Sequence, residues 1–429
     1  MVDLLRKTLG KISNTAAFSW AGKGLWAVID QALFAGTNFL VNILLARWLE
    51  PSAYGAFSVA YSLFMLLGTF HTALWTEPML VYGSGRFRNS FNKYQDILLN
   101  YHWRFSALIV LIFLLLAGVS EGAGQRALAL GFLGLALAAP SVLYLWLVRR
   151  GAYALLQPRL AAAGGALYLA LYTGVTLILL KVGLLNETTA FWGMGLAALL
   201  AAWVIRGWGS EIKVGQVDPK EVCRLHWAYG RWALLAGALS WLPMNIYFLV
   251  LPAVHGLDEV AALKALMNLV MPVLHFNGAI AALFVPVYVR AHHQGALGKV
   301  VWVSGAVLTF FALLYQILLV NWGGTLVVLL YGGKYMQESS LLGLLGFLPL
   351  IIAWVNTWGA MHRSLERPSL VAFSYLLASF LSVAIGVPFS AHAGLRGAII
   401  SMLLIYCTLA AILFILAIKL DASEHGEKA

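Results

Sequence analysis

The residues best suited to chemistry lie inside apolar stretches. Residues 23–62 (KGLWAVIDQALFAGTNFLVNILLARWLEPSAYGAFSVAYS) hold an apolar span that contains Asp30, Asn38 and Asn42 and ends in a charged turn at Arg47. On a helix that advances about 100° per residue, the polar side chains of this span fall within roughly 140° of one another. A carboxylate inside a membrane span costs about 2.5–3.5 kcal/mol on insertion scales. Asp30 therefore indicates either a functional site or a polar contact that holds neighbouring helices together.

A second polar stripe occurs in the sequence AALKALMNLVMPVLHFNGAI. Lys264, Asn268 and His275 fall within roughly 40° of one another on a helix, so we expect this stripe to face away from lipid. Pro272 lies within the stripe and is expected to bend the helix, because proline removes a backbone donor. The alternative is that Lys264 reaches the outer interface while His275 packs in the core.

The composition requires a membrane protein. Of 429 residues, 62% are hydrophobic and only 10% are charged, and the mean hydropathy is +0.85. So few charges do not cover a soluble protein of this size. Cys223 and Cys407 lie in no CxxC or Cys/His pattern, so neither a disulfide framework nor a metal site is predicted. The basic segment 1–23 lacks the apolar core of a signal peptide and is predicted to lie in the membrane interface.

Runs of about 20 apolar residues predict an all-α polytopic protein with twelve membrane spans. Their limits are about 24–46, 53–75, 97–118, 127–148, 160–180, 188–205, 229–251, 260–289, 300–320, 340–360, 369–389 and 395–418. With both termini in the cytoplasm, 22 of the 28 Lys and Arg residues fall on the inner side. Because short cytoplasmic loops retain positive charge, this distribution supports the topology. It also explains the net charge of +11 without a nucleic-acid partner.

The two halves of the chain repeat one another. LLQPRL (155–160) matches LERPSL (365–370), Pro140 matches Pro349, and Pro78 matches Pro286, at offsets of 208 to 210 residues. The longest connection, 207–227, lies between the halves. We predict two six-helix lobes, 1–209 and 210–429. Because six spans return the chain to its starting side, the lobes form a parallel repeat.

The hairpin LARWLEPSAYGAF (45–57) carries a family resemblance. It is similar to the start of the Wzx-type polysaccharide-biosynthesis flippases of the multidrug/oligosaccharidyl-lipid/polysaccharide (MOP) superfamily. The resemblance implies two lobes around a central cavity that is lined by the first, second, seventh and eighth spans. It implies alternating access, through which a lipid-linked oligosaccharide reaches the outer leaflet of the bacterial inner membrane. Membrane lipids, glycosyltransferases and a polysaccharide polymerase would be the partners.

Cations at the span ends fit such a substrate. Lys23, Arg104 and Arg231 lie at predicted inner ends, whereas Arg47 and Lys264 lie at predicted outer ends. A polyprenyl-pyrophosphate sugar carries about two negative charges, so its path needs cations and hydrogen-bonding groups. The positive-inside bias alone is the alternative explanation for the inner three.

Two other functions compete with the flippase. A cation-coupled multidrug exporter of the related MATE type often carries a coupling Asp in its first span, and Asp30 would fit, but the fifth and sixth spans contain no Asp to complete the ion site. An enzyme would need an acid cluster, whereas the 17 Asp and Glu residues are scattered mostly in loops. We therefore expect a transporter without a cofactor or metal.

Overall fold

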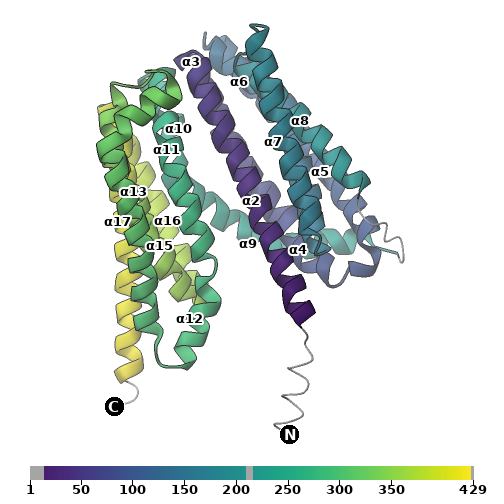
Figure 1. Cartoon of the computed structure of the whole chain (residues 1–429), viewed down its shortest axis with the longest axis vertical. Coiled ribbons are helices and arrows are strands. Elements are labelled where there is room, and N and C mark those ends of the chain that lie inside the picture. Colours follow the sequence, from purple (N-terminus) through teal and green to yellow (C-terminus); the bar gives the residue numbers. More distant parts are fainter. Residues whose placement is uncertain (1–13, 209–215, 427–429) are drawn as a thin grey trace. The chain divides into compact units, whose positions relative to one another are not determined.

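The computed structural model describes residues 14–208 and 216–426, and within these ranges it consists of helices joined by short turns, with no strand (Figure 1). Most of the predicted interfacial segment and part of the predicted connection 207–227 lie outside the described residues. The elements are α2 (Asn14–Trp48), α3 (Pro51–His71), η1 (Thr72–Thr76), α4 (Glu77–Ser84), η2 (Arg88–Ser90), α5 (Phe91–Gly122), α6 (Arg126–Ala154), α7 (Pro158–Lys181), α8 (Glu187–Gly207), α9 (Pro219–Asn245), α10 (Tyr247–Val254), α11 (Leu257–Ala281), α12 (Phe284–His293), α13 (Leu297–Tyr331), η3 (Glu338–Leu341), α14 (Leu342–Leu345), α15 (Phe347–Ser364), α16 (Pro368–Leu381), η4 (Ser382–Gly386) and α17 (Val387–Gly426).

The number of spans agrees with the sequence. Ten described helical segments are long and apolar enough to cross a membrane, and α9 with α10 forms an eleventh that bends by 44°. The last segment, Pro368–Ile418, is 51 residues long, about twice what a bilayer requires. It is divided at Gly394, whose φ of 57° and ψ of −144° interrupt the helix. Counted as two crossings, this segment brings the number to the predicted twelve.

A carboxylate satisfies the backbone at this interruption. Glu259 of α11 accepts a hydrogen bond from the Leu395 N–H at 2.7 Å, where the helix begins again. A Cβ atom at Gly394 would lie 2.7 Å from both carboxylate oxygens, so glycine is needed there for space as well as for its positive φ.

The chain forms two compact units. One comprises the described parts of 1–41 and 67–234, and the other comprises 42–66 and the described parts of 235–429. The unit limits thus fall inside α2, α3 and α9. The predicted lobe boundary at 209/210 lies in an undescribed range and stays a prediction.

In unit 1, α6 packs against α5, α7 and α8. Small residues bring α6 and α8 together. A Cβ atom on Gly134 would lie 2.8 Å from the Thr188 Cα, and one on Gly195 would lie 2.8 Å from the Ala138 Cα. Close backbone approach is how membrane helices associate when water exclusion supplies no driving force.

In unit 2, α15 packs against α11, α12, α13 and α17. Residues 42–66, which comprise the last two turns of α2 and most of α3, also belong to this unit. The entry of α3 is tightly fitted, because a Cβ atom on Gly55 would overlap the carbonyl of Leu257. Pro243 lies in the last turn of α9, next to the 44° bend between α9 and α10.

The repeated hexapeptides form matching turns. Leu156 and Glu366 both have a φ of 58°. Each lies two residues before the proline that begins the next helix, which is α7 in the first half and α16 in the second. Gln157 N–H bonds to Ala152 O at 2.8 Å, and Arg367 N–H bonds to His362 O at 2.9 Å. The α6–α7 and α15–α16 hairpins therefore turn in the same way, as the sequence repeat predicts.

Candidate functional site

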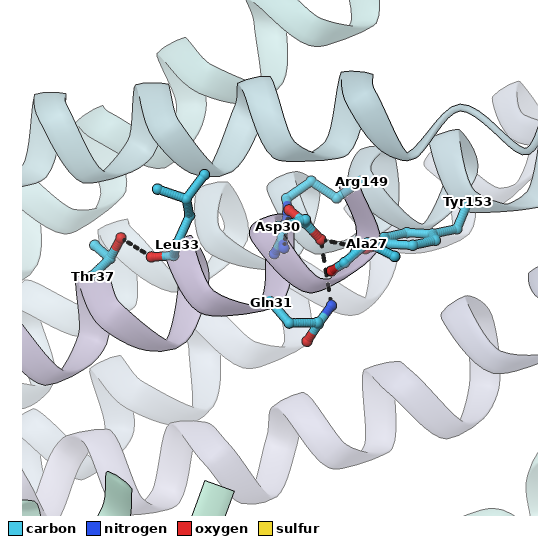
Figure 2. Close-up of polar contacts among 7 residues, drawn as sticks. All are labelled: Ala27, Asp30, Gln31, Leu33, Thr37, Arg149 and Tyr153. Carbon is cyan, nitrogen blue, oxygen red and sulfur yellow. Dashed lines mark hydrogen bonds and ion pairs between the residues drawn. The ribbon is translucent and has the colours of Figure 1, made fainter. Parts of the chain in front are cut away.

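Asp30 lies in a buried ionic cluster in unit 1 (Figure 2). Its carboxylate has no exposed surface, and its Oδ1 accepts from Arg149 Nη2 at 2.7 Å and from Nε at 3.3 Å. The Tyr153 hydroxyl donates to Oδ2 at 2.7 Å, and Gln31 Nε2 lies 3.4 Å from the same oxygen. Arg149 and Tyr153 are four residues apart, so they share one face of α6. Asp30 on α2 therefore meets two donors from a single neighbouring helix.

Packing around the cluster fixes this geometry. The Arg149 guanidinium lies 4.0 Å from the centroid of the Phe34 ring, and Tyr168 of α7 stacks on the same ring at 5.8 Å. A Cβ atom at Gly165 of α7 would lie 3.2 Å from Asp30 Oδ1, so a side chain there would press on the carboxylate. The cluster is thus enclosed by α2, α6 and α7. Its charges cancel locally, and a buried, neutralised carboxylate offers little attraction to a cationic ligand.

Arg149 corrects one detail of the sequence interpretation. The fourth span was predicted to end at residue 148, which placed Arg149 among the inner cations, but α6 continues to Ala154 and Arg149 is only 6% exposed. Its charge is therefore held inside the helix bundle by Asp30.

The remaining polar residues of α2 lie elsewhere. Thr37 donates to the carbonyl of Leu33 at 2.7 Å, Asn38 is half-buried, and Asn42 is 7% exposed. Asn42 and everything beyond it in α2 belongs to unit 2, so the predicted stripe is divided between the two units.

Arg47 binds a helix end. Its Nη1 donates to the carbonyl of Leu329 at 2.7 Å, in the last turn of α13. Lys334, just beyond α13, donates in return to the carbonyl of Leu49 at 2.8 Å, at the end of α2. Each helix therefore has its carbonyl end bound by a cation that lies at or just beyond the C-terminal end of the other helix, which is favourable for the helix dipoles. A direct pairing of Arg47 with Lys264 is not among the described contacts.

Lys264 lies between aromatic rings in unit 2. Its Nζ is 5.1 Å from the ring centroid of Tyr61 on α3 and 5.9 Å from that of Phe248 on α10. Both distances allow cation–π attraction. Lys264 and Tyr61 are half-buried, and no ion pair joins Lys264 to an acid within residues 14–208 and 216–426. Unlike Asp30, this charge is not neutralised by a neighbouring side chain.

The other two residues of the α11 stripe, Asn268 and His275, differ in burial. Asn268 is 5% exposed and donates from Nδ2 to the Tyr54 hydroxyl at 2.9 Å, which places it in the core. His275 is exposed. Of the stripe, Lys264 and His275 are thus accessible, whereas Asn268 positions Tyr54.

The three predicted inner-mouth cations are not grouped by any described contact. Lys23 is half-buried, and Arg104 is exposed on α5. Arg231 is exposed on α9, where its guanidinium lies 5.4 Å from the neighbouring Trp232 ring. Their assignment to a common mouth stays a prediction.

Two buried histidines escaped the sequence analysis. His71 Nε2 lies 3.2 Å from His102 Nδ1, and Ser106 Oγ lies 3.4 Å from the other nitrogen of His102. Neither ring has exposed surface, and the rings of Trp75 and Phe105 lie beside His71. Their signal in the sequence was the same as that of Asp30, a polar residue inside an apolar span.

A third histidine compensates for Pro78. Proline has no N–H, so the carbonyl of Leu74, four residues earlier, lacks its helical donor. The chain forms the π-helical turn Thr72–Thr76 here, and His226 Nδ1 of α9 lies 2.7 Å from Leu74 O. Because a carbonyl only accepts, Nδ1 carries the proton, and Nε2 accepts from the Tyr94 hydroxyl at 2.7 Å. Both nitrogens of His226 are therefore satisfied by unit 1.

Comparison with known proteins supports this architecture. No family model matches the sequence, and no curated protein matches it significantly. Among solved structures, the inward-facing form of a multidrug resistance MATE family transporter of the MOP superfamily matches with a TM-score of 0.75 and 14% identity, over 94% of this chain and 100% of that one. A MOP superfamily transporter from Pyrococcus furiosus matches with a TM-score of 0.64 and 13% identity, over 93% and 94%. The fold is that of the MATE/MOP transporters.

Sequence identities of 13–14% establish the fold but not the ligand. The ligand must be inferred from the side chains of this chain. Within the described ranges no group of three or more His, Cys, Asp or Glu residues is arranged to hold a metal ion. Two charged features inside the helix bundles bear most directly on the ligand, namely the neutralised Asp30 cluster in unit 1 and Lys264 beside its aromatic rings in unit 2.

Proposed function

We propose that the protein is an alternating-access transporter that moves polyprenyl-pyrophosphate-linked oligosaccharide from the inner to the outer leaflet of a bacterial inner membrane. Lys264 carries the proposal, because it is a half-buried cation whose neighbours are aromatic rings rather than acids. A pyrophosphate needs such a cation, and a sugar stacks on aromatic faces such as that of the half-buried Tyr61. Glycosyltransferases and a polymerase would supply and consume this substrate.

The balance of charges supports an anionic substrate. Asp30 is occupied by Arg149 and Tyr153, whereas Lys264 has no acidic partner among the described residues. The Pyrococcus furiosus transporter, which shares this fold, is described as having a binding pocket of reverse polarity that suggests a different function. A fold that carries pockets of opposite polarity is compatible with a cationic one here.

The MATE/MOP fold supports the mechanism. Multidrug resistance MATE transporters of this fold have been solved in an inward-facing form and in an outward-facing form, the latter matching with a TM-score of 0.61 and 14% identity, over 94% of this chain and 95% of that one. Two forms of one fold are what alternating access requires.

A MATE-type cation-coupled multidrug exporter is the second candidate. Two observations favour it, namely the multidrug transporters among the similar structures and a carboxylate in the first span. In such an exporter Asp30 would have to exchange Arg149 for a proton or another cation during the cycle, which would leave the guanidinium without its partner.

Flipping in proteoliposomes distinguishes these functions. The full-length protein is reconstituted with fluorescent polyprenyl-pyrophosphate glycan, and an impermeant quencher reports the outer leaflet. A charge-assisted phosphate contact contributes about 1.5–3 kcal/mol, so Lys264→Gln should slow flipping roughly ten- to a hundredfold while Lys264→Arg retains most activity. Lys299→Gln is the matched control, because Lys299 is an exposed lysine of the same unit. Arg47→Gln tests the second predicted outer cation.

Equal flipping by Lys264→Gln and the parent protein at matched membrane levels would refute the cationic site. Uptake of a lipophilic cation driven by a proton or sodium gradient, lost in Asp30→Asn, would instead support the exporter.

A further inference from the structure

A cavity of about 430 Å³ opens at one end of unit 1, where Val148, Gly151 and Ala152 line it from a different face of α6 than the one that carries Arg149 and Tyr153. It lies where α5 and α7 begin and where α6 and α8 end. Its polar lining consists of Asn92, Lys93, Gln95, Asp96, Gln157 and Arg206. The topology predicted from positive charge places this end on the cytoplasmic side.

The lining has a net positive charge. Arg206 Nη2 lies 2.9 Å from Asp96 Oδ1, which neutralises one cation. Lys93 is exposed and forms no ion pair within the part of the chain that the structure describes. The Asp96–Arg206 pair is itself accessible, with side chains 62% and 43% exposed, and the other contact of Arg206, from Nη1 to the Tyr144 hydroxyl, is long at 3.5 Å. Arg206 can therefore turn toward a ligand at little cost. The cavity thus offers one unpaired ammonium, one exchangeable guanidinium and three amide side chains.

Close packing keeps the cavity open. A Cβ atom at Gly151 would lie 2.6 Å from Gln95 Nε2, so the amide lies directly against the α6 backbone. A larger residue at Gly151 would push Gln95 into the cavity. The absence of a side chain there leaves room for a ligand between α5 and α6.

The exposed side chains of α8 indicate that the cavity lies near the level expected for lipid headgroups. On α8 the apolar side chains Leu196, Leu200 and Trp203 are 50%, 40% and 72% exposed, as expected for a helix face in contact with lipid. This face ends at Trp208, which is 65% exposed and has the residue type that marks membrane interfaces. The residues of α8 that line the cavity, Ile205 to Gly207, lie directly before Trp208 and therefore at the same level of the helix.

We propose that this cavity binds the phosphate-bearing headgroup of an anionic phospholipid. Basic pockets between membrane helices on the cytoplasmic side are suited to such headgroups. Lys93 supplies a point charge to the phosphate, and Arg206 exchanges its contact with Asp96 for a bidentate contact with phosphate oxygens. The amides of Asn92 and Gln95 hydrogen-bond the remaining headgroup oxygens. Acyl chains lie along the exposed face of α8.

Lipid binding is measured on the full-length protein in detergent, as the shift in melting temperature and as adducts in native mass spectrometry. The probes are phosphatidylglycerol, phosphatidylcholine and soluble glycerol 3-phosphate. Phosphatidylglycerol should stabilise the protein, and the other two should not. Lys93→Gln should weaken phosphatidylglycerol binding about tenfold, the amount expected for one charged contact. Lys220→Gln removes an exposed lysine of the same unit outside the cavity and should bind like the parent.

Asp96→Asn makes the test independent of damage to the fold. It removes the acid that competes for Arg206, so phosphatidylglycerol should bind severalfold more tightly than to the parent. A loss of affinity can come from misfolding, but a gain cannot. Unchanged affinity in both Lys93→Gln and Asp96→Asn overturns the site, and equal stabilisation by glycerol 3-phosphate overturns its assignment to a lipid.

Discussion

The Asp30–Arg149 pair predicts a large and specific coupling energy. We expect Asp30→Asn and Arg149→Met each to destabilise the protein strongly, because each leaves one charge buried without its partner. The double variant Asp30→Asn/Arg149→Met should recover most of the loss, because it removes both charges together. Tyr153 retains an acceptor in the asparagine oxygen, so its hydroxyl stays bonded.

The magnitude follows from burial. Side-chain exposure is 8% for Arg149 and 0% for Asp30, against 43% for Arg206 and 62% for Asp96. Unit charges about 4 Å apart attract by about 4 kcal/mol at an effective dielectric constant near 20. Breaking a buried pair costs about 3–5 kcal/mol, whereas an exposed pair contributes about 0–1 kcal/mol. We therefore expect a coupling of at least about 2 kcal/mol for the buried pair and less than about 1 kcal/mol for the exposed one.

The assay is a double-mutant cycle on purified protein in detergent micelles, with unfolding followed by tryptophan fluorescence during titration with a denaturing detergent. The matched control cycle uses Asp96→Asn and Arg206→Met. Asp96 and Arg206 form an ion pair of the same two residue types, but on the surface of the same unit. The flipping rate of Asp30→Asn across pH, at matched levels of folded protein, then tests the predicted role of Asp30 in coupling.

Two results contradict this reasoning. If the buried and exposed cycles give the same coupling, burial does not determine the strength of the pair. If Asp30→Asn is as stable as the parent protein, Arg149 has found another partner and the ionic cluster does not hold α2 to α6.

Two further predictions concern helix contacts. Gly55→Ala should reduce the yield of folded protein severely, because its Cβ would overlap a backbone carbonyl, whereas Gly278→Ala, with nothing within 4 Å, should give a normal yield in size-exclusion chromatography. His226→Phe should lower the melting temperature by leaving Leu74 O and the Tyr94 hydroxyl without a partner, at about 1–3 kcal/mol for each buried group. His226→Asn, which keeps a donor and an acceptor, should recover part of that loss, and equal melting temperatures for Phe and Asn would contradict the bonding scheme.

The helices and their repeat could be predicted because they depend on local composition. Apolar runs, prolines at helix starts and the matched hexapeptides are all visible in the sequence. Asp30 was found for the same reason, since a carboxylate inside an apolar run is a local signal. Its two partners, Arg149 and Tyr153, lie 119 and 123 residues away, so no periodicity connects them.

The unpredicted part of the site depends on which helices pack together. Lys264 was identified, but Tyr61 and Phe248 lie on other helices, and aromatic residues at such positions look like ordinary core. From the sequence, Arg47 was placed on a substrate path because it is a cation near the end of a span. Nothing in the neighbouring sequence indicates that it binds the carbonyl of Leu329, which lies 282 residues further along the chain. The His226 contact could have been suspected from Pro78, since a missing backbone donor leaves a carbonyl that some other group must satisfy.

The matching turns at Leu156 and Glu366 bear on how the protein is made. Each turn joins two apolar helices over a few residues, so each pair can enter the bilayer from the translocon as one helical hairpin, with its ends already close together. Arg150 and Arg159 flank the first turn, and Arg363 and Arg367 lie at the second. Each hairpin thus carries its own orientation signal, and its insertion need not wait for the rest of the chain. If the first hairpin were inserted in the wrong orientation, the arginines at the second turn would still orient the second hairpin correctly.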